Sequence, residues 1–236
     1  MMTPLMYIAV VVIGYVLGSI PFGLFIGKMF AKTDIREVGS GKIGMTNVLR
    51  TAGKKAAALS LILDIAKGAA AVLIAGLIFQ NKTQVNDSIF TWTESAKALA
   101  ALSAIAGHSW SVFLKFRGGR GVATFMGGLI ALYWPAALVG GVLIFGIGFR
   151  TKYMSLGSII GAVTAFIMLM SLNILEVVFF GFKQYPPFEY VVFAMIGAIF
   201  IYIMHRDNIF RLFNGTERKI GEKAKAVTST TTNHPK

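Results

Sequence analysis

The chain has 236 residues, of which 56% are hydrophobic and only 14% are charged, and its net charge is +13. Soluble domains carry about 25% charged residues, so this composition excludes a soluble fold and indicates a chain that lies in lipid. The absence of cysteine excludes disulfides and thiolate metal sites. The basic residues lie between apolar runs, which argues against nucleic acid as a partner and for anionic lipids or phosphates.

Five apolar runs are candidate membrane spans, since a spanning helix needs about 20 apolar residues. They are 5–27, 57–79, 96–114, 153–180 and 189–204. The first run lacks a basic leader and a small-residue cleavage site, so it is interpreted as a true span. The stretch 121–149 is too long for one straight span. Because proline favours the first turn of a new helix, Pro135 predicts two short helices there, 121–133 and 135–149.

The distribution of Lys and Arg predicts the topology. These residues concentrate in 28–55, 115–120, 150–152 and the segment after 204, whereas 81–95 and 181–188 hold only Lys82 and Lys183. The positive-inside rule places the basic segments in the cytoplasm. We therefore expect an all-α integral membrane protein with seven transmembrane helices, the N-terminus outside and the C-terminus cytoplasmic. Residues 1–220 form a single transmembrane domain, and the polar segment 221–236 is expected to be a disordered cytoplasmic tail.

The first polar cluster is DIREVGSGKIGMTNVLR, residues 34–50. Its glycines permit tight turns and close approach of backbone N–H groups to a ligand. Ser40, Thr46 and Asn47 add hydroxyl and amide groups, and Arg36 and Arg50 add permanent positive charge. This combination suits a phosphate. The alternative is a flexible basic loop that only sets the topology.

The second cluster is GHSWSVFLKFRGGRGVAT, residues 107–124, in which FRGGRG joins two apolar runs. A glycine-rich turn that opens a helix presents free N–H groups and the positive end of the helix dipole. This turn, reinforced by the charges of Arg117 and Arg120, is therefore a candidate anion site. The alternative is a tight helix–helix turn with ordinary cytoplasmic charge.

The third cluster is HRDNIFRLFNGTERK, residues 205–219, directly after the last span, and it places His205, Asn208, Arg211 and Glu217 where this helix leaves the membrane. His205 and Asn208 are three residues apart and share a helical face, although a histidine at this position is also typical of an interfacial anchor. Within the second span, Asp64 and Lys67 are also three apart, and a structural ion pair is expected because unpaired charges in a span are costly.

These three clusters, in order and at matching spacing, resemble the signature loops of the bacterial acyl-phosphate:glycerol-3-phosphate acyltransferase family, PlsY. GSIPFGLFIGK, residues 18–28, is similar to the beginning of the first signature. Two positions depart from the family pattern: Lys42 stands where the family usually has Asn, and Arg120 where it usually has Lys. Both Arg and Lys bind phosphate, but Arg binds it as a planar fork.

The resemblance implies a membrane acyltransferase of phospholipid biosynthesis in the bacterial inner membrane, with its active site facing the cytoplasm. It would move a fatty acyl group from acyl phosphate to the 1-hydroxyl of glycerol 3-phosphate, giving lysophosphatidic acid and phosphate, with no metal or other cofactor. Residues 1–220 would then be the catalytic domain. The implied catalytic residues are Arg120, Ser40, His205 and Asn208. The implied substrate-binding residues are Ser40, Thr46, Asn47, Arg50, Gly118, Gly119, Arg120, Ser155, His205 and Asn208.

Two questions stay open at this point. No carboxylate lies beside the glycines of FRGGRG, so the leaving donor phosphate is expected to take the proton of the acceptor hydroxyl, with His205 as the rival general base. The alternative function is an organic-phosphate transporter or channel. It predicts charged groups near the middle of several spans, and only Asp64 and Lys67 fit that description.

Overall fold

The structure is a computed structural model that describes residues 2–80, 91–179 and 184–222. Most of the expected tail, 221–236, lies outside the described residues. Eight α-helices and two short 3-10 helices form in the described part. They are α1 (Met2–Ser19), α2 (Phe22–Ala31), η1 (Ile35–Glu37), α3 (Met45–Phe79), α4 (Trp92–Ser109), η2 (Val112–Leu114), α5 (Val122–Thr151), α6 (Met154–Ile174), α7 (Phe188–Met204) and α8 (Arg206–Phe213).

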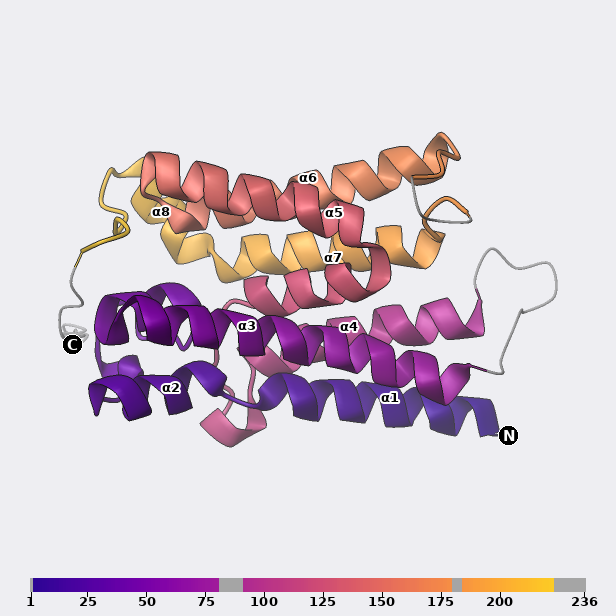
Figure 1. The fold of residues 1–236 in the computed structure, drawn as a ribbon, viewed down its shortest axis with the longest axis horizontal. Coiled ribbons are helices and arrows are strands. Elements are labelled where there is room, and N and C mark those ends of the chain that lie inside the picture. The colour runs from indigo at the N-terminus through magenta and orange to yellow at the C-terminus, as the bar shows by residue number, and fades with distance from the viewer. Residues whose placement is uncertain (1, 81–90, 180–183, 223–236) are drawn as a thin grey trace, which may run out of the picture.

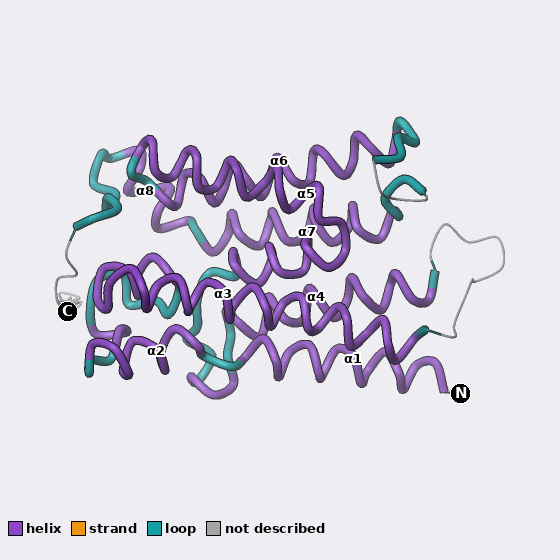
Figure 2. Tube along the Cα trace, viewed as in Figure 1, coloured by secondary structure: helices purple, strands orange, loops and turns teal. Residues whose placement is uncertain are grey.

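The helices form an elongated bundle, and most lie along its long axis (Figure 1). α1 begins at the right end of Figure 1, and α8 lies at the left end. The loops after α2, between α4 and α5, and after α8 all lie in the left half (Figure 2). The bundle thus gathers three loops that are far apart in the sequence.

The first apolar run was expected to be a true span over 5–27, and residues 4–31 are long and apolar enough to cross a membrane. The run is broken between α1 and α2, because Pro21 has no N–H to donate and restricts the residue before it. Two carbonyl groups freed at the break find side-chain donors. Ser111 Oγ donates to the Ser19 carbonyl at 2.6 Å, and Lys67 Nζ donates to the Ile20 carbonyl at 2.9 Å.

The expected pair of helices over 121–149 is confirmed by the break in α5. Tyr133 there has non-helical backbone angles, φ −155° and ψ 86°, next to Pro135. The chain doubles back at this point, so the two halves of α5 lie antiparallel (Figure 1). The first half packs closely on α3, where a Cβ on Gly127 would overlap the Ile65 carbonyl oxygen. Glycine permits this close approach of two helix backbones.

Several other helix ends differ from expectation for local reasons. α4 begins at Trp92 rather than 96, because the Thr91 side chain accepts a hydrogen bond from the Glu94 N–H at 3.1 Å and caps the helix. It ends at Ser109, and η2 follows where the helix was expected to continue to 114. α6 ends at Ile174 rather than 180, and the left-handed backbone of Glu176 (φ 52°) follows.

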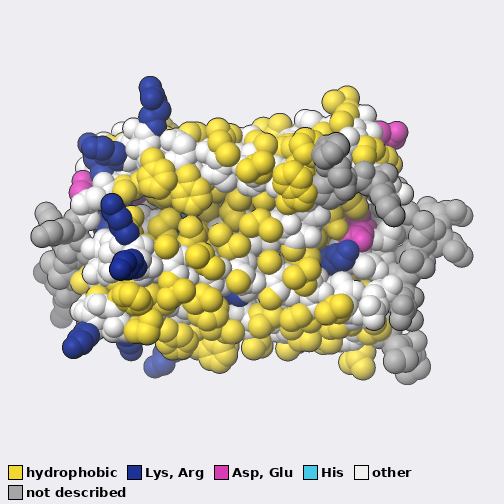
Figure 3. Space-filling view, in the orientation of Figure 1, with side chains coloured by type: hydrophobic (Ala, Val, Ile, Leu, Met, Phe, Trp, Pro, Cys, Tyr) yellow, Lys and Arg dark blue, Asp and Glu magenta, His cyan; other side chains and the backbone are white. Residues whose placement is uncertain are grey.

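Four helical segments of the described residues are long and apolar enough to cross a membrane, and the bent pair of α7 and α8 makes a fifth. The four are 4–31, α3, α5 and α6. Hydrophobic side chains cover the middle of the molecule in Figure 3, and Lys and Arg gather mainly near its left end. The observed architecture is therefore an all-helical membrane bundle with one strongly basic end.

Candidate functional site

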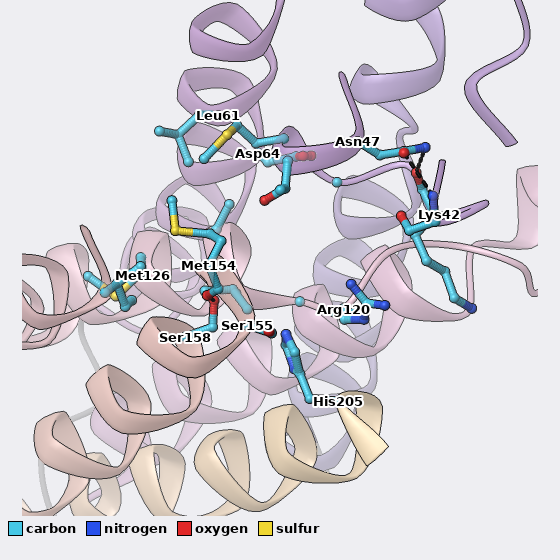
Figure 4. Close-up of a pocket in the computed structure, with 18 of the residues that line it drawn as sticks. Lys42, Asn47, Leu61, Asp64, Arg120, Met126, Met154, Ser155, Ser158 and His205 are labelled. Carbon is cyan, nitrogen blue, oxygen red and sulfur yellow. Dashed lines mark hydrogen bonds between the residues drawn. The ribbon is translucent and has the colours of Figure 1, made fainter. Parts of the chain in front are cut away.

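A cavity of about 270 Å³ lies where the three loops meet the bundle (Figure 4). It is lined from both halves of the chain, by polar residues of the loops and helices and by apolar residues of the helices. The polar residues are Ser40, Lys42, Thr46, Asn47, Arg50, Asp64, His108, Arg120, Ser155, Ser158, His205, Asn208, Glu217 and Arg218. All the residues expected from sequence to bind substrate are in this set except Gly118 and Gly119.

The loop before α3 is organised by the buried amide of Asn47. Its Nδ2 donates to the carbonyl oxygens of Ile35 at 2.7 Å and Lys42 at 2.9 Å, and its Oδ1 accepts from the Ser40 N–H at 3.0 Å. A further contact reaches the Val38 carbonyl. Because these bonds use the amide fully, Asn47 holds the loop that presents Ser40 and Lys42 to the cavity.

Arg50 joins the beginning of α3 to the C-terminal segment. Its Nη2 donates to the carbonyl oxygen of Arg218 at 3.1 Å, across 168 positions of sequence. Its Nε is buried and has no hydrogen-bond partner among the described residues. A guanidinium held at one edge with a donor left over is suited to an anion in the cavity.

The two glycines of the second loop serve the turn itself. The Gly118 N–H donates to the Ser109 carbonyl and the Gly119 N–H to the His108 carbonyl, both at 3.0 Å. A side chain on either glycine would overlap His108. The first residues of α5, from Val122, line the cavity instead. The N-terminus of α5, rather than these two glycines, therefore faces the cavity. Contact of the glycines with a phosphate stays a prediction.

Arg120 is the partly buried cation of this loop. Its Nε has no hydrogen-bond partner among the described residues. Burial lowers the pKa of Arg120 to about 10, which leaves the guanidinium charged at neutral pH. Figure 4 shows its side chain near Lys42 on one side of the cavity. A cation whose buried Nε donor has no partner indicates an anionic ligand.

His205 lies at the bend between α7 and α8, which turn by 59°. Its side chain is buried, and Nδ1 lies 2.8 Å from the carbonyl oxygen of Ile201. Because a carbonyl only accepts, this contact assigns the proton to Nδ1 and leaves Nε2 as an acceptor. His205 can therefore accept a hydrogen bond from a hydroxyl in the cavity.

Glu217 is a site residue that the sequence placed in the third cluster without assigning it a role. Its Oε1 accepts from Ser155 Oγ at 3.0 Å and Asn208 Nδ2 at 2.6 Å, and its Oε2 accepts from Arg211 Nε at 2.8 Å. One carboxylate thereby orients the cavity residues of α6 and α8. The residue is visible in the third cluster, but nothing in its spacing points to Ser155, which is 62 positions away.

The opposite part of the cavity is apolar. It is lined by Leu61, Ile65, Met126, Ile130, Ile144, Phe145 and Met154, which come from α3, both halves of α5, and α6. Figure 4 shows Leu61, Met126 and Met154 on the side away from Arg120 and Lys42. The cavity is thus amphiphilic, with a cationic end and an apolar end.

The expected ion pair within the second span is confirmed. Lys67 Nζ lies 2.7 Å from Asp64 Oδ1, and both side chains are buried. His108 Nδ1 lies 3.5 Å from the same oxygen. Asp64 and His108 line the cavity, whereas Lys67 does not. Asp64 of α3 is therefore a second carboxylate in the lining of the cavity, in addition to Glu217.

Comparison with known proteins identifies relatives over almost the whole chain. The family model described as glycerol-3-phosphate acyltransferase matches residues 8–215. Glycerol-3-phosphate acyltransferase 3 of Dehalococcoides mccartyi (strain CBDB1) is 51% identical over 217 residues, which cover 92% of this chain and 96% of the relative. Glycerol-3-phosphate acyltransferase of Rhodopseudomonas palustris (strain BisB5) is 45% identical over 217 residues, covering 92% and 97%.

Two crystal structures of PlsY, an integral membrane glycerol 3-phosphate acyltransferase, have the same fold. The glycerol 3-phosphate form has a TM-score of 0.76 at 33% identity and covers 91% of this chain and 96% of that one. The lysophosphatidic acid form has a TM-score of 0.74 at 32% identity and covers 90% and 94%.

Proposed function

Because the chain belongs to the glycerol-3-phosphate acyltransferase family, we propose that it transfers a fatty acyl group from acyl phosphate to the 1-hydroxyl of glycerol 3-phosphate. The products are lysophosphatidic acid and inorganic phosphate, as a step of phospholipid biosynthesis. PlsY has been crystallised in forms named for glycerol 3-phosphate and lysophosphatidic acid, which are the acceptor and product of this reaction.

The amphiphilic cavity is the observation that carries the proposal. Its cationic end contains Lys42, Arg50, Arg120 and Arg218, and its apolar end is formed by the helices. Both substrates carry a phosphate, and the donor also carries an acyl chain. Guanidinium groups bind phosphate oxygens through forked hydrogen bonds, and an apolar wall lowers the free energy of an acyl chain by removing it from water.

The roles follow from the position of each group. Arg120, with the N-terminus of α5, binds the donor phosphate. Ser40, Arg50, Ser155, His205 and Asn208 bind glycerol 3-phosphate, while Thr46 and Asn47 shape the first loop. An acyl phosphate is already activated, so catalysis requires mainly positioning and stabilisation of negative charge. The acceptor hydroxyl attacks the acyl carbon, the bond from that carbon to the phosphate oxygen breaks, and phosphate leaves.

The proton of the attacking hydroxyl has two possible acceptors, the leaving phosphate and Nε2 of His205. We favour the phosphate, which carries negative charge and is present in every turnover. His205→Gln and His205→Ala should be assayed at saturating substrate concentrations. A Gln variant that retains substantial kcat excludes His205 as the essential base, whereas loss of kcat in both variants with unchanged binding contradicts the role of the phosphate.

We also propose seven membrane crossings, with the N-terminus outside and the cationic end of the cavity at the cytoplasmic face of the bacterial inner membrane. The reversal of α5 at Tyr133 supports the two crossings assigned to that segment. The basic end of the molecule supports the orientation through the positive-inside rule. Labelling of single cysteines introduced at residues 3 and 152, from outside sealed cells, should reach only the first.

The assay of function uses purified protein in phospholipid vesicles, hexadecanoyl phosphate and labelled glycerol 3-phosphate, without coenzyme A or acyl carrier protein. Labelled lysophosphatidic acid is the expected product. A transporter would instead accumulate unmodified glycerol 3-phosphate inside the vesicles. Family membership and the gathering of cations at one end of the cavity favour the acyltransferase.

A further inference from the structure

The carboxylate of Asp64 lies in the wall of the cavity with one oxygen unused. Its side chain is only 1% exposed, and Oδ1 lies 2.7 Å from the ammonium of Lys67. Neither oxygen has a hydrogen bond of good geometry among the described residues, and the ion-pair contacts of Lys67 and His108 are both to Oδ1 rather than Oδ2. A buried polar atom of this kind raises the free energy of the protein unless a donor reaches it. Figure 4 shows the carboxylate pointing into the cavity.

The charged neighbours of Asp64 contact only one of its two carboxylate oxygens. Lys67 also donates to the Ile20 carbonyl and lies over the ring of Phe22, so the ammonium is held on the side of α1 and α2. His108 contacts the same oxygen as Lys67 does. The ion pair thus accounts for Oδ1, and Oδ2 is left facing the cavity.

The serine hydroxyls on the opposite wall donate their protons elsewhere. Ser155 donates to Glu217, and Ser158 donates to the carbonyl oxygen of Met154 at 2.8 Å. An ionised carboxylate only accepts hydrogen bonds. These two hydroxyls therefore leave Oδ2 open to a donor from a molecule that occupies the cavity.

The chemistry of the two substrates decides which group this donor is. A phosphate would be repelled by Asp64 and belongs at the cationic end, and an acyl chain has no donor. Glycerol 3-phosphate carries two hydroxyl groups, of which one is acylated. We propose that Asp64 Oδ2 accepts a hydrogen bond from the hydroxyl of glycerol 3-phosphate that is not acylated. This inference rests on the proposed function.

An electrostatic argument assigns to Asp64 the hydroxyl of glycerol 3-phosphate that is not acylated, rather than the hydroxyl that attacks the acyl group. Negative charge develops on the carbonyl oxygen of the acyl group during the attack, and a carboxylate beside it would raise the barrier. At the spectator hydroxyl the same carboxylate orients the acceptor without opposing that charge. A site that binds a substrate hydroxyl also discriminates against analogues that lack it. Asp64 is therefore a residue that determines acceptor specificity.

The test compares glycerol 3-phosphate with propane-1,3-diol monophosphate, which has the attacking hydroxyl but lacks the second one. Wild-type protein should use the diol phosphate with a kcat/KM lower by about 10-fold or more, the range for hydrogen bonds to a charged group. Asp64→Asn should lose activity on glycerol 3-phosphate and much less on the diol phosphate, so that the ratio between the two acceptors collapses toward one.

Lys67→Gln is the matched control, since it breaks the same ion pair from outside the cavity. It should reduce thermal stability but keep the acceptor ratio of the wild type. If Asp64→Asn does not fold, the double variant Asp64→Asn/Lys67→Gln leaves no unpaired ion and serves for the same comparison.

Three results overturn the inference: equal use of both acceptors by the wild type, an unchanged ratio in the Asp64 variant, or an equal collapse in Lys67→Gln. An unchanged ratio would mean that Oδ2 is satisfied by water or that Asp64 acts only through its ion pair. Failure of the wild type to form lysophosphatidic acid at all would instead reject the proposed function.

Discussion

Asn208 donates from Nδ2 to Oε1 of Glu217 at 2.6 Å, and this contact connects α8 to the segment that follows it. The same oxygen accepts from Ser155 at the beginning of α6. Two residues expected to bind glycerol 3-phosphate therefore have their orientation set by a third residue. The other carboxylate oxygen is bound to Arg211, so Glu217 is fully used inside the protein.

Replacement of Glu217 by Ala should destabilise the protein and lower its activity. It leaves the donors of Asn208, Ser155 and Arg211 without their acceptor, and the expected loss is about 2–4 kcal/mol in the free energy of unfolding. Thermal unfolding in detergent and kcat/KM for glycerol 3-phosphate measure the two effects. Glu222→Ala, at an exposed position five residues on, is the control and should change stability by less than about 0.5 kcal/mol. Equal effects of the two changes would contradict the role of Glu217.

Arg120 should be replaceable by Lys but not by Gln. The positive charge is what the donor phosphate requires, and Arg120→Gln should lower kcat/KM by about 100- to 1,000-fold, as for loss of one donor to a developing anion. Arg120→Lys keeps the charge and should stay within about 10-fold of the wild type. Steady-state kinetics with hexadecanoyl phosphate provide the measurement. Arg117 belongs to the same loop but does not line the cavity, so Arg117→Gln is the control and should change kcat/KM little. A loss as large as that of Arg120→Gln would mean that the net charge of the loop, rather than the position of Arg120, determines kcat/KM.

Leu61 should limit the space available to the acyl chain. A Trp at this position of α3 fills part of the apolar end of the cavity. The expected result is a kcat/KM for hexadecanoyl phosphate reduced by about 10-fold, the scale of an overpacking cost, with a smaller effect for octanoyl phosphate. Ile62, the next residue, is 61% exposed and does not line the cavity. Ile62→Trp should leave both donors unaffected, and a uniform loss for both donors in Leu61→Trp would place the chain elsewhere.

Lys42 should make stability depend on pH. Burial, together with the nearby guanidinium of Arg120, holds the pKa of Lys42 below its usual value. The unfolded chain then binds the proton more tightly than the folded protein does, so stability rises with pH between the lowered pKa and the ordinary lysine value. Lys42→Asn removes this contribution. The variant should therefore have the higher Tm at pH 7, and its advantage should shrink as the pH approaches about 10.5. A difference in Tm that is constant across this range would refute the assignment.

Local patterns in the sequence determined much of the fold. Apolar runs of spanning length, Pro135 within 121–149, and the spacing of Asp64 and Lys67 predicted features that depend on a few neighbouring residues. The break at Tyr133 and the ion pair of 2.7 Å confirm two of them. The interruption at Pro21 also depends on neighbouring residues only. It was not predicted, because an apolar run on both sides of the proline does not show whether the helix is continuous.

The sequence by itself determined that this is a polytopic membrane protein with three phosphate-suited loops, because apolar length, charge and glycine–arginine motifs are properties of short segments. Only the tertiary structure decided how those segments combine. The contact of Ser155 with Glu217 spans 62 positions, and that of Arg50 with Arg218 spans 168. Such pairs depend on the order in which helices pack. The same packing turned Asp64 toward the cavity while Lys67, three residues away, satisfied the break in the first span.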